Sequence, residues 1–245
     1  GSGKSTLIKD CLYGNSIREY GQSYESPGNV SSISGLHNLK EIIMITQETI
    51  GTSNRSNPAS YMKIYDEIRK LMSESPGAKK ARLRPGDFSF NTDGGRCDDC
   101  KGDGKKKIEM QFLSDLEVDC DSCNGKKFKS YILDIQYKGQ NINNILDLTI
   151  DEARRFFENN KKITDKLDIL SSVGLDYLQL GQPSNTLSGG ESQRIKIAKS
   201  LLAKNSTNVL YILDEPSIGL HLEDLKNLIN TFEFIIEKGN SIIVI

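Results

Sequence analysis

The sequence contains no apolar run long enough to span a bilayer and no signal-peptide pattern. Its charge is nearly balanced, with 32 basic and 33 acidic residues and a formal net charge of −1 at pH 7. This balance excludes a global electrostatic field of the kind that marks many nucleic-acid-binding proteins, but it leaves local basic patches open. Histidine is scarce, since His37 and His221 are the only two. A chain of 245 residues is still long enough to bury a sizeable core in one or two domains.

One stretch near the C-terminus combines a helix start with an anion-binding pattern. Residues 187–194 read Leu-Ser-Gly-Gly-Glu-Ser-Gln-Arg, where Ser188 is a good N-cap and Glu191 stands at the spacing of a capping box. Gly189 and Gly190 let a ligand approach the backbone, where free N–H groups and the positive end of the helix dipole would face an anion. An ordinary capped helix is the alternative, and two further motifs argue against it.

The first six residues have the pattern of a phosphate-binding loop. They read Gly-Ser-Gly-Lys-Ser-Thr and match the second half of G-x-x-x-x-G-K-[ST]. In such a loop Lys4 would reach the β- and γ-phosphates, and the Ser5 hydroxyl would bind Mg²⁺. The other nucleotide-binding residues of the loop are Gly1, Ser2, Gly3 and Thr6. Because the pattern starts upstream of Gly1, we expect the chain to be a fragment of a longer protein, truncated at both ends.

Two adjacent acids follow an apolar strand further along the chain. Residues 209–213 read Val-Leu-Tyr-Ile-Leu, and Asp214 and Glu215 come directly after them. Phosphoryl transfer depends mainly on positioning and on stabilisation of charge. Asp214 would bind Mg²⁺, and Glu215 would be the catalytic residue that orients and polarises the attacking water. A purely structural explanation is sufficient for a single acid at a strand end. It explains two adjacent acids after an apolar strand poorly.

These three motifs resemble the Walker A, signature and Walker B motifs of ABC-type ATPases. The resemblance implies an α/β fold, in which an ABC-type P-loop NTPase domain carries a helical signature subdomain. It also implies a catalytic role for Gln47, which follows the apolar run 42–45 as the glutamine of a Q-loop does. Residues 216–221 resemble a D-loop, and neither histidine stands where the switch histidine is expected.

Four of the five cysteines form two C-x-x-C pairs, each followed closely by a glycine. The four are Cys97, Cys100, Cys120 and Cys123. Two such pairs at this separation fit a tetrahedral zinc site. The odd fifth cysteine, Cys11, and the ATPase motifs favour a metal over disulfides. Four buried free thiols are the alternative, while a redox pair is disfavoured because nothing in the sequence resembles a thioredoxin-like unit.

Lysines cluster around the cysteine pairs, and they support two interpretations equally. The cluster consists of Lys105, Lys106, Lys107, Lys126, Lys127 and Lys129. Contact with phosphates is one interpretation, and a solvated rim is the other. Several aspartates nearby, among them Asp98 and Asp121, weaken a purely electrostatic argument.

The order of the motifs predicts four segments. They are the first part of the ATPase core (1–75), a zinc-binding insertion (76–135), the helical signature subdomain (136–186) and the rest of the core (187–245). Local patterns predict strands over 41–46, 108–112, 130–137, 208–213 and 241–245. They predict a helix that Asn57 caps, with Pro58 in its first turn and an apolar stripe over 61–72. They also predict a helix that starts with a capping box of Thr149 and Glu152, and further helices over 163–172, 195–202 and 222–236.

A long insertion with two C-x-x-C pairs between the Q-loop and the signature is not typical of a transporter subunit. This order resembles the C-terminal nucleotide-binding half of the UvrA family, the damage-sensing ATPases of bacterial nucleotide excision repair. The stretches that carry the resemblance are 55–59, 88–91, 94–97, 107–110, 137–139, 187–194, 214–216 and 219–221. It implies a cytoplasmic ATPase, not itself a nuclease, that uses ATP, Mg²⁺ and Zn²⁺.

The family resemblance also implies partners. They are duplex DNA, the helicase-like protein UvrB, a second copy in a homodimer, and the first nucleotide-binding domain of the same full-length chain, with no membrane. Ser188 to Glu191 would then close over an ATP bound by that other domain. Four residues depart from the usual family pattern, namely Thr46, Asp93, Gln111 and Ser114. They leave open a UvrA-like paralogue for tolerance of DNA-binding drugs. An ABC transporter subunit and a zinc-stabilised module with nucleotide as a switch are further alternatives.

Overall fold

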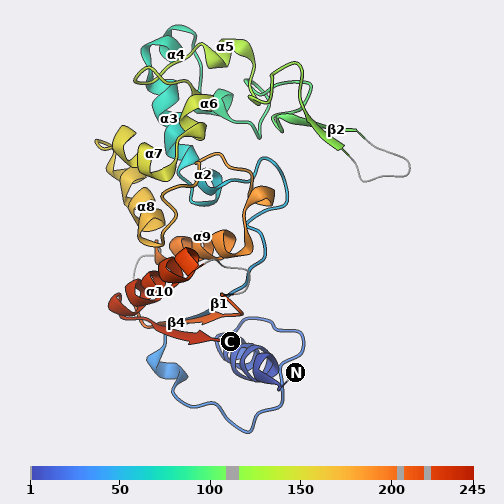
Figure 1. Ribbon diagram of the computed structural model, residues 1–245, viewed down its shortest axis with the longest axis vertical. Coiled ribbons are helices and arrows are strands. Elements are labelled where there is room, and N and C mark those ends of the chain that lie inside the picture. Colours follow the sequence, from blue (N-terminus) through green and yellow to red (C-terminus); the bar gives the residue numbers. More distant parts are fainter. Residues whose placement is uncertain (1, 109–115, 203–206, 218–221) are drawn as a thin grey trace. The chain divides into compact units, whose positions relative to one another are not determined.

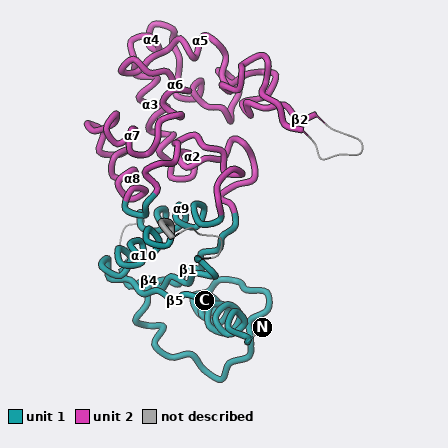
Figure 2. Tube along the Cα trace, in the orientation of Figure 1, with its two compact units in different colours: residues 1–48, 172–174, 189–245 teal, residues 49–171, 175–188 magenta. Residues whose placement is uncertain are grey.

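The computed structural model describes residues 2–108, 116–202, 207–217 and 222–245. It divides the chain into two compact units (Figure 2), each considered by itself below. Unit 1 comprises residues 1–48, 172–174 and 189–245, and unit 2 comprises residues 49–171 and 175–188. Within the described ranges, no helix is both long and apolar enough to cross a membrane.

Some expectations lie outside the described residues. They concern the role of Gly1 in the phosphate loop, the far part of the strand over 108–112, the departures at Gln111 and Ser114, and residues 218–221 of the D-loop with His221.

Unit 1 is built on a three-stranded parallel sheet with the order β1, β4, β5, two strands of which are labelled in Figure 1 and all three in Figure 2. The strands are β1 Glu41–Ile45, β4 Val209–Leu213 and β5 Ser241–Val244. All five residues of the central strand β4 are buried, because the strand is covered on both faces and paired on both edges. This explains why β4 is continuously apolar, and the strands lie where the apolar runs predict them.

Helices cover both faces of this sheet. The π-helical η1 Thr6–Gly14 follows the phosphate loop and leads into α1 Asn15–Glu19. Ile8 and Leu12 of η1 pack against Leu210 and Ile212 of β4. Successive side chains of a strand point to opposite faces, so Tyr211 points the other way. Its hydroxyl accepts a hydrogen bond from Ser200 Oγ at 3.2 Å.

The remaining elements of unit 1 are the 3₁₀ turn η2 Leu36–Asn38 and two long helices. Ser200 belongs to the first of these, α9 Gly189–Leu201. The second, α10 Leu222–Glu237, contacts β5 and ends close to where the sequence predicts.

Unit 2 consists of short helices and one antiparallel ribbon. Its helices are α2 Pro58–Tyr61, α3 Tyr65–Glu74, α4 Pro76–Lys80, α5 Ser130–Leu133, α6 Ile142–Asp147, α7 Ile150–Phe156 and α8 Lys161–Ser172. Two 3₁₀ turns, η3 Pro85–Phe88 and η4 Ser184–Thr186, connect them. The ribbon pairs β2 Lys105–Ile108 with β3 Leu116–Asp119.

Two predicted helix starts in unit 2 are confirmed, and side-chain caps explain them. Asn57 Oδ1 accepts a hydrogen bond from the Ser60 N–H at 2.8 Å, and Pro58 occupies the first position of α2. Thr149 and Glu152 form the predicted capping box at the start of α7. In that box Glu152 Oε2 accepts from the Thr149 N–H at 2.8 Å.

Two predictions are wrong. The single helix over 61–72 is interrupted, because Lys63 adopts a left-handed backbone with φ 54°, so α2 and α3 are separate. The strand over 130–137 is instead the short helix α5 and a loop. Its alternating apolar residues suggested period two, but the buried ones, Ile132 and Ile135, are three apart, which is helical spacing.

An aromatic stack joins α3 to the segments around the cysteine pairs. The rings of Tyr65 and Phe90 are stacked with centroids 4.6 Å apart, and Phe128 lies 6.3 Å from Phe90. All three side chains are buried. The Tyr65 hydroxyl donates a hydrogen bond to the Phe88 carbonyl oxygen at 2.5 Å. Buried tyrosines need such a partner, so this bond fixes the loop before Cys97 on α3.

Replacing Tyr65 by Phe should therefore destabilise the protein. The Phe88 carbonyl would be left buried without its partner, which costs about 1–3 kcal/mol of the free energy of unfolding. Urea denaturation would measure the loss. Tyr177→Phe is the control, because the Tyr177 side chain is 52% exposed and water can replace any bond that its hydroxyl loses. Equal stability of the two variants would contradict the role of the Tyr65 hydroxyl.

Candidate functional site: a phosphate-loop cavity and a four-cysteine cluster

A cavity of about 350 Å³ in unit 1 brings the phosphate loop and the second acid together. Its lining residues are Ser2, Gly3, Lys4, Ser5, Thr6, Glu215 and Ile245. Glu215 follows β4 and Ile245 follows β5, and these parallel strands end at the same edge of the sheet. Ligands of open α/β sheets bind outside this edge, so the cavity lies where such a fold binds them.

The loop conformation suits an anion. Gly3 has φ 81°, a left-handed conformation that other residues rarely adopt, and its carbonyl accepts from the Leu7 N–H at 2.9 Å. The helix η1 begins at Thr6, directly after Ser5, so its positive end is at the cavity. Lys4 Nζ donates to Ser2 Oγ at 3.2 Å and is exposed. A phosphate group would therefore meet an ammonium, hydroxyls and a helix N-terminus.

The two carboxylate oxygens of Asp214 have different surroundings. Oδ2 forms an ion pair with Lys9 Nζ, and this hydrogen bond raises the pKa of Lys9. Oδ1 is buried and has no hydrogen-bond partner among the described residues. A buried oxygen without a partner is costly, and Mg²⁺ prefers oxygen ligands. Asp214 and the Ser5 hydroxyl thus offer oxygen donors of the kind that magnesium prefers, although Asp214 is not among the described residues that line the cavity.

The backbone of Glu215 is held at both of its polar groups. Its N–H donates to the Ile245 carbonyl at 2.9 Å, and its own carbonyl accepts from Gln47 Nε2 at 2.7 Å. The residue adopts φ 46°, which is strained for a non-glycine residue. Such strain persists only where the surroundings enforce it, and it is concentrated at functional sites. Sequence patterns give no signal for this conformation or for Lys9 beside Asp214.

The signature residues lie at the start of α9. The helix begins at Gly189, directly after Ser188, and Glu191 is in its first turn. A Cβ on Gly189 would lie 2.9 Å from Gln47 Oε1, so the glycine permits the close approach of that side chain. Gly190 is buried. The described residues that line the phosphate-loop cavity include none from Ser188 to Glu191, and the nucleotide role of these four stays a prediction.

The four cysteines of the two pairs form one cluster in unit 2. Their sulfurs all lie within 4.8 Å of one another, and their exposed fractions are 8% or less. Cys97 Sγ is 3.9 Å from Cys120 Sγ, and Cys100 Sγ is 3.7 Å from Cys123 Sγ. Tetrahedral zinc with Zn–S bonds of about 2.3 Å places sulfurs about 3.8 Å apart. The cluster therefore has the dimensions of a Cys₄ zinc site, and these separations are far longer than a disulfide bond.

Backbone N–H groups point at these sulfurs. Cys100 Sγ accepts from the Gly104 N–H at 3.3 Å and also from Gly102. A Cβ on Gly102 would lie 2.0 Å from the Phe90 carbonyl oxygen, so only glycine fits there. Burial raises the pKa of Cys100. Burial also opposes ionisation of Cys120, but hydrogen bonds from N–H donors outweigh it and lower the pKa of Cys120 to about 7. A divalent cation would stabilise all four thiolates together.

Several lysines of the cluster are already paired. Lys105 forms an ion pair with Glu117, Lys106 with Asp99 and Lys129 with Asp98. Lys127 points inward and donates to the Asn54 carbonyl oxygen at 2.9 Å. These contacts favour a structural role for these four residues over direct phosphate contact.

Known proteins resemble the chain along its whole length. A family model described as "ABC transporter" matches residues 104–218. UvrABC system protein A of Aquifex aeolicus is 49% identical over 245 residues, which is all of this chain and 26% of that protein. The proteins of the same name from Methanothermobacter thermautotrophicus and Thermus thermophilus are each 46% identical over the same shares. The chain thus spans about a quarter of the length of the curated relatives it matches.

A solved structure agrees with these relatives. The crystal structure of UvrA2 from Deinococcus radiodurans matches with a TM-score of 0.89 and 38% identity. The match covers 100% of this chain and 29% of that one.

The ion pair at Asp214 leads to a prediction about magnesium. A cation bound by Asp214 would compete with Lys9, and a partly exposed ion pair of this kind contributes up to about 1 kcal/mol. Lys9→Met should therefore lower the Mg²⁺ concentration for half-maximal binding of a fluorescent ATP analogue, by up to about fivefold. Lys40→Met is the control, since Lys40 is an exposed lysine of the same unit that bonds Thr207. An increased Mg²⁺ requirement in Lys9→Met would contradict the competition.

Proposed function

Because the chain is a UvrA-type segment of an ABC ATPase, we propose that the protein containing it binds and hydrolyses ATP at the phosphate-loop cavity. The observation that carries this proposal is the meeting of the loop residues 2–6 and Glu215 in one cavity. The Gln47 hydrogen bond to the Glu215 carbonyl adds a second side chain at the same place.

The residues around the cavity would have different roles in ATP hydrolysis. Lys4 and the loop N–H groups would hold the β- and γ-phosphates. Ser5 and Asp214 would hold Mg²⁺, which supplies positive charge against the phosphate oxygens. Glu215 would orient the attacking water, assisted by Gln47. The Glu215 backbone is held at its N–H and its carbonyl, which fixes where its side chain leaves the chain beside the cavity.

The signature residues would serve a second nucleotide. Ser188, Gly189, Gly190 and Glu191 would close over an ATP held by the first nucleotide-binding domain of the full-length chain. The helix start at Gly189 supports this, since a helix N-terminus favours an anion. Two such sites per protomer, in a homodimer, complete the proposed assembly.

The four-cysteine cluster would bind one zinc ion. The sulfur separations support this, as do the N–H groups that face the sulfurs. The cysteines themselves form a buried cluster, so the metal would stabilise a module with little apolar core of its own.

The full-length protein would bind duplex DNA in the cytoplasm and act in nucleotide excision repair with UvrB as its partner. The names of the relatives, which are subunits of a UvrABC system, support this reading. A UvrA-like paralogue is the second candidate, and the likeness to a solved UvrA2 favours it.

Binding of damaged duplex with transfer to UvrB would select the first candidate, and DNA binding without transfer would select the second. Failure of the full-length protein to bind DNA at low salt would remove both.

Glu215→Gln tests the catalytic assignment. Turnover of ATP by the full-length protein at this site should fall about 100-fold or more, while bound ATP persists, because the amide keeps the shape but loses the charge. Single-turnover hydrolysis and nucleotide retention would be measured together. Glu48→Gln is the matched control, since Glu48 is an exposed glutamate of the same unit. Unchanged turnover in Glu215→Gln would remove this residue from catalysis.

Cysteine variants test the metal. Cys97→Ser and Cys123→Ser should each lose about one zinc ion per chain, because a tetrahedral thiolate site tolerates the loss of a ligand poorly. Metal analysis by mass spectrometry would measure the content. Cys11→Ser should retain all the zinc, since Cys11 is not part of the cluster. Full zinc content in Cys97→Ser would overturn the ligand assignment.

A further inference from the structure

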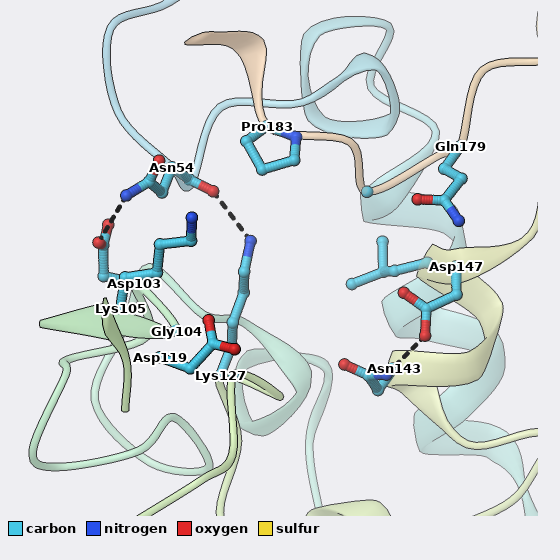
Figure 3. Close-up of a pocket in the computed structure, with 13 residues that line it drawn as sticks. Asn54, Asp103, Gly104, Lys105, Asp119, Lys127, Asn143, Asp147, Gln179 and Pro183 are labelled. Atoms are coloured by element: carbon cyan, nitrogen blue, oxygen red, sulfur yellow. Dashed lines mark hydrogen bonds between the residues drawn. The ribbon is translucent and has the colours of Figure 1, made fainter. Parts of the chain in front are cut away.

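Asn54 is a buried residue, 7% exposed, at which three segments of unit 2 meet. Its Nδ2 donates to Asp103 Oδ2 at 3.0 Å and to Glu117 Oε2 at 3.3 Å. Its Oδ1 accepts from Asn185 Nδ2 at 2.8 Å. Its backbone carbonyl accepts from Lys127 Nζ at 2.9 Å (Figure 3). Both amide hydrogens and both oxygens of the residue are used, and two carboxylates on one side fix the orientation of the amide.

Three of these partners belong to the segments that carry the two C-x-x-C pairs, residues 97–108 and 116–129, which we call the cysteine module. Asp103 follows Cys100, and its N–H donates to the Cys100 carbonyl at 3.0 Å. Glu117 lies in β3 of the ribbon. The Lys127 N–H donates to the Cys123 sulfur, and the Lys127 carbonyl accepts from the Cys97 N–H at 2.8 Å. Asn54 is therefore connected to Cys100 through Asp103, and to Cys97 and Cys123 through Lys127. A single intervening residue separates it from each C-x-x-C pair.

The fourth partner belongs to the segment before the signature. Asn185 lies in η4, the turn that ends two residues before Ser188. A second hydrogen bond joins the same turn to the segment of Asn54, because the N–H of the buried Ser184 donates to the Ser56 carbonyl oxygen at 2.8 Å. A displacement of the cysteine module that moves Asn54 would therefore act on η4 directly.

We propose that Asn54 is a positioning residue that couples the cysteine module to the signature motif. When duplex DNA pulls on the module, the bonds of Asn54 to Asp103, Glu117 and Lys127 carry the displacement to Asn185. The position of Ser188 then changes, and with it the rate of ATP hydrolysis. This inference rests on the proposed function, because it requires that the protein binds DNA and hydrolyses ATP. Contiguous hydrogen bonds make such coupling possible, and a double-mutant cycle measures it.

The experiment uses the full-length protein and a duplex oligonucleotide with a bulky adduct. The variants are Asn54→Ala, Asn185→Ala and the double variant. Asn159→Ala is the control, since Asn159 is an exposed asparagine of the same unit that bonds only Glu158 among the contacts described for it. Asn185→Ala removes one bond at an exposed turn, so it keeps the test decisive even if Asn54→Ala folds poorly. Zinc content, DNA affinity and turnover with and without DNA are measured for each.

We expect the DNA-dependent change in turnover to shrink about fivefold in Asn54→Ala and Asn185→Ala. Turnover without DNA, zinc content and DNA affinity should stay near those of the unmodified protein. The double variant should lose no more than the more affected single variant, because both substitutions interrupt one route.

A DNA response in Asn185→Ala equal to that of the control, or additive losses in the double variant, would overturn the coupling while leaving the proposed function intact. An unmodified protein that ignores DNA would overturn the proposed function, and the coupling with it.

Discussion

The parallel pairing of β4 with β1 on one side and β5 on the other positions the parts of the phosphate-loop cavity. The register places Ile45 opposite Leu213, and Leu213 opposite Val244, so the three strands end together. Gln47, Glu215 and Ile245 follow these ends and are joined by hydrogen bonds. Since β4 is buried throughout, a shift in its register would expose apolar side chains and displace the acids at the same time. Stability and the geometry of the site therefore depend on the same contact.

The four-cysteine cluster of unit 2 lies beside both apolar and polar contacts. The stack of Tyr65, Phe90 and Phe128 supplies the apolar ones, and charged and amide groups join the segments around it. Buried polar groups are tolerated when all their hydrogen bonds are made, and they then specify one arrangement. Asn54 meets this condition, which gives the module a defined position on the segments around it in the same unit. The four-cysteine cluster and the polar junction share one residue, because the Lys127 N–H donates to the Cys123 sulfur and its Nζ donates to the Asn54 carbonyl oxygen.

Sequence patterns predict the helix caps of unit 2, whereas the pattern over 130–137 is compatible with both a strand and a helix. The caps at Asn57 and Thr149 depend on neighbours within four residues, so their sequence patterns were sufficient. The alternation over 130–137 predicts a strand because it is compatible with period two. Burial of Ile132 and Ile135 against other parts of unit 2 selects the helix, and sequence periodicity over so few residues cannot reveal that choice.

Short patterns with fixed spacing indicate the family resemblance, the phosphate-loop motif, the acid pair after β4 and the two cysteine pairs, because each pattern depends on residues that are close in the chain. Which other side chains lie beside these motifs follows from the folded structure alone. Lys9 on Asp214, Gln47 on the Glu215 carbonyl and Asn54 between the cysteine module and η4 each join residues far apart in the chain. Such contacts depend on which surfaces the sheet and helices bring together, and short patterns carry no information about residues beyond their own turn or strand.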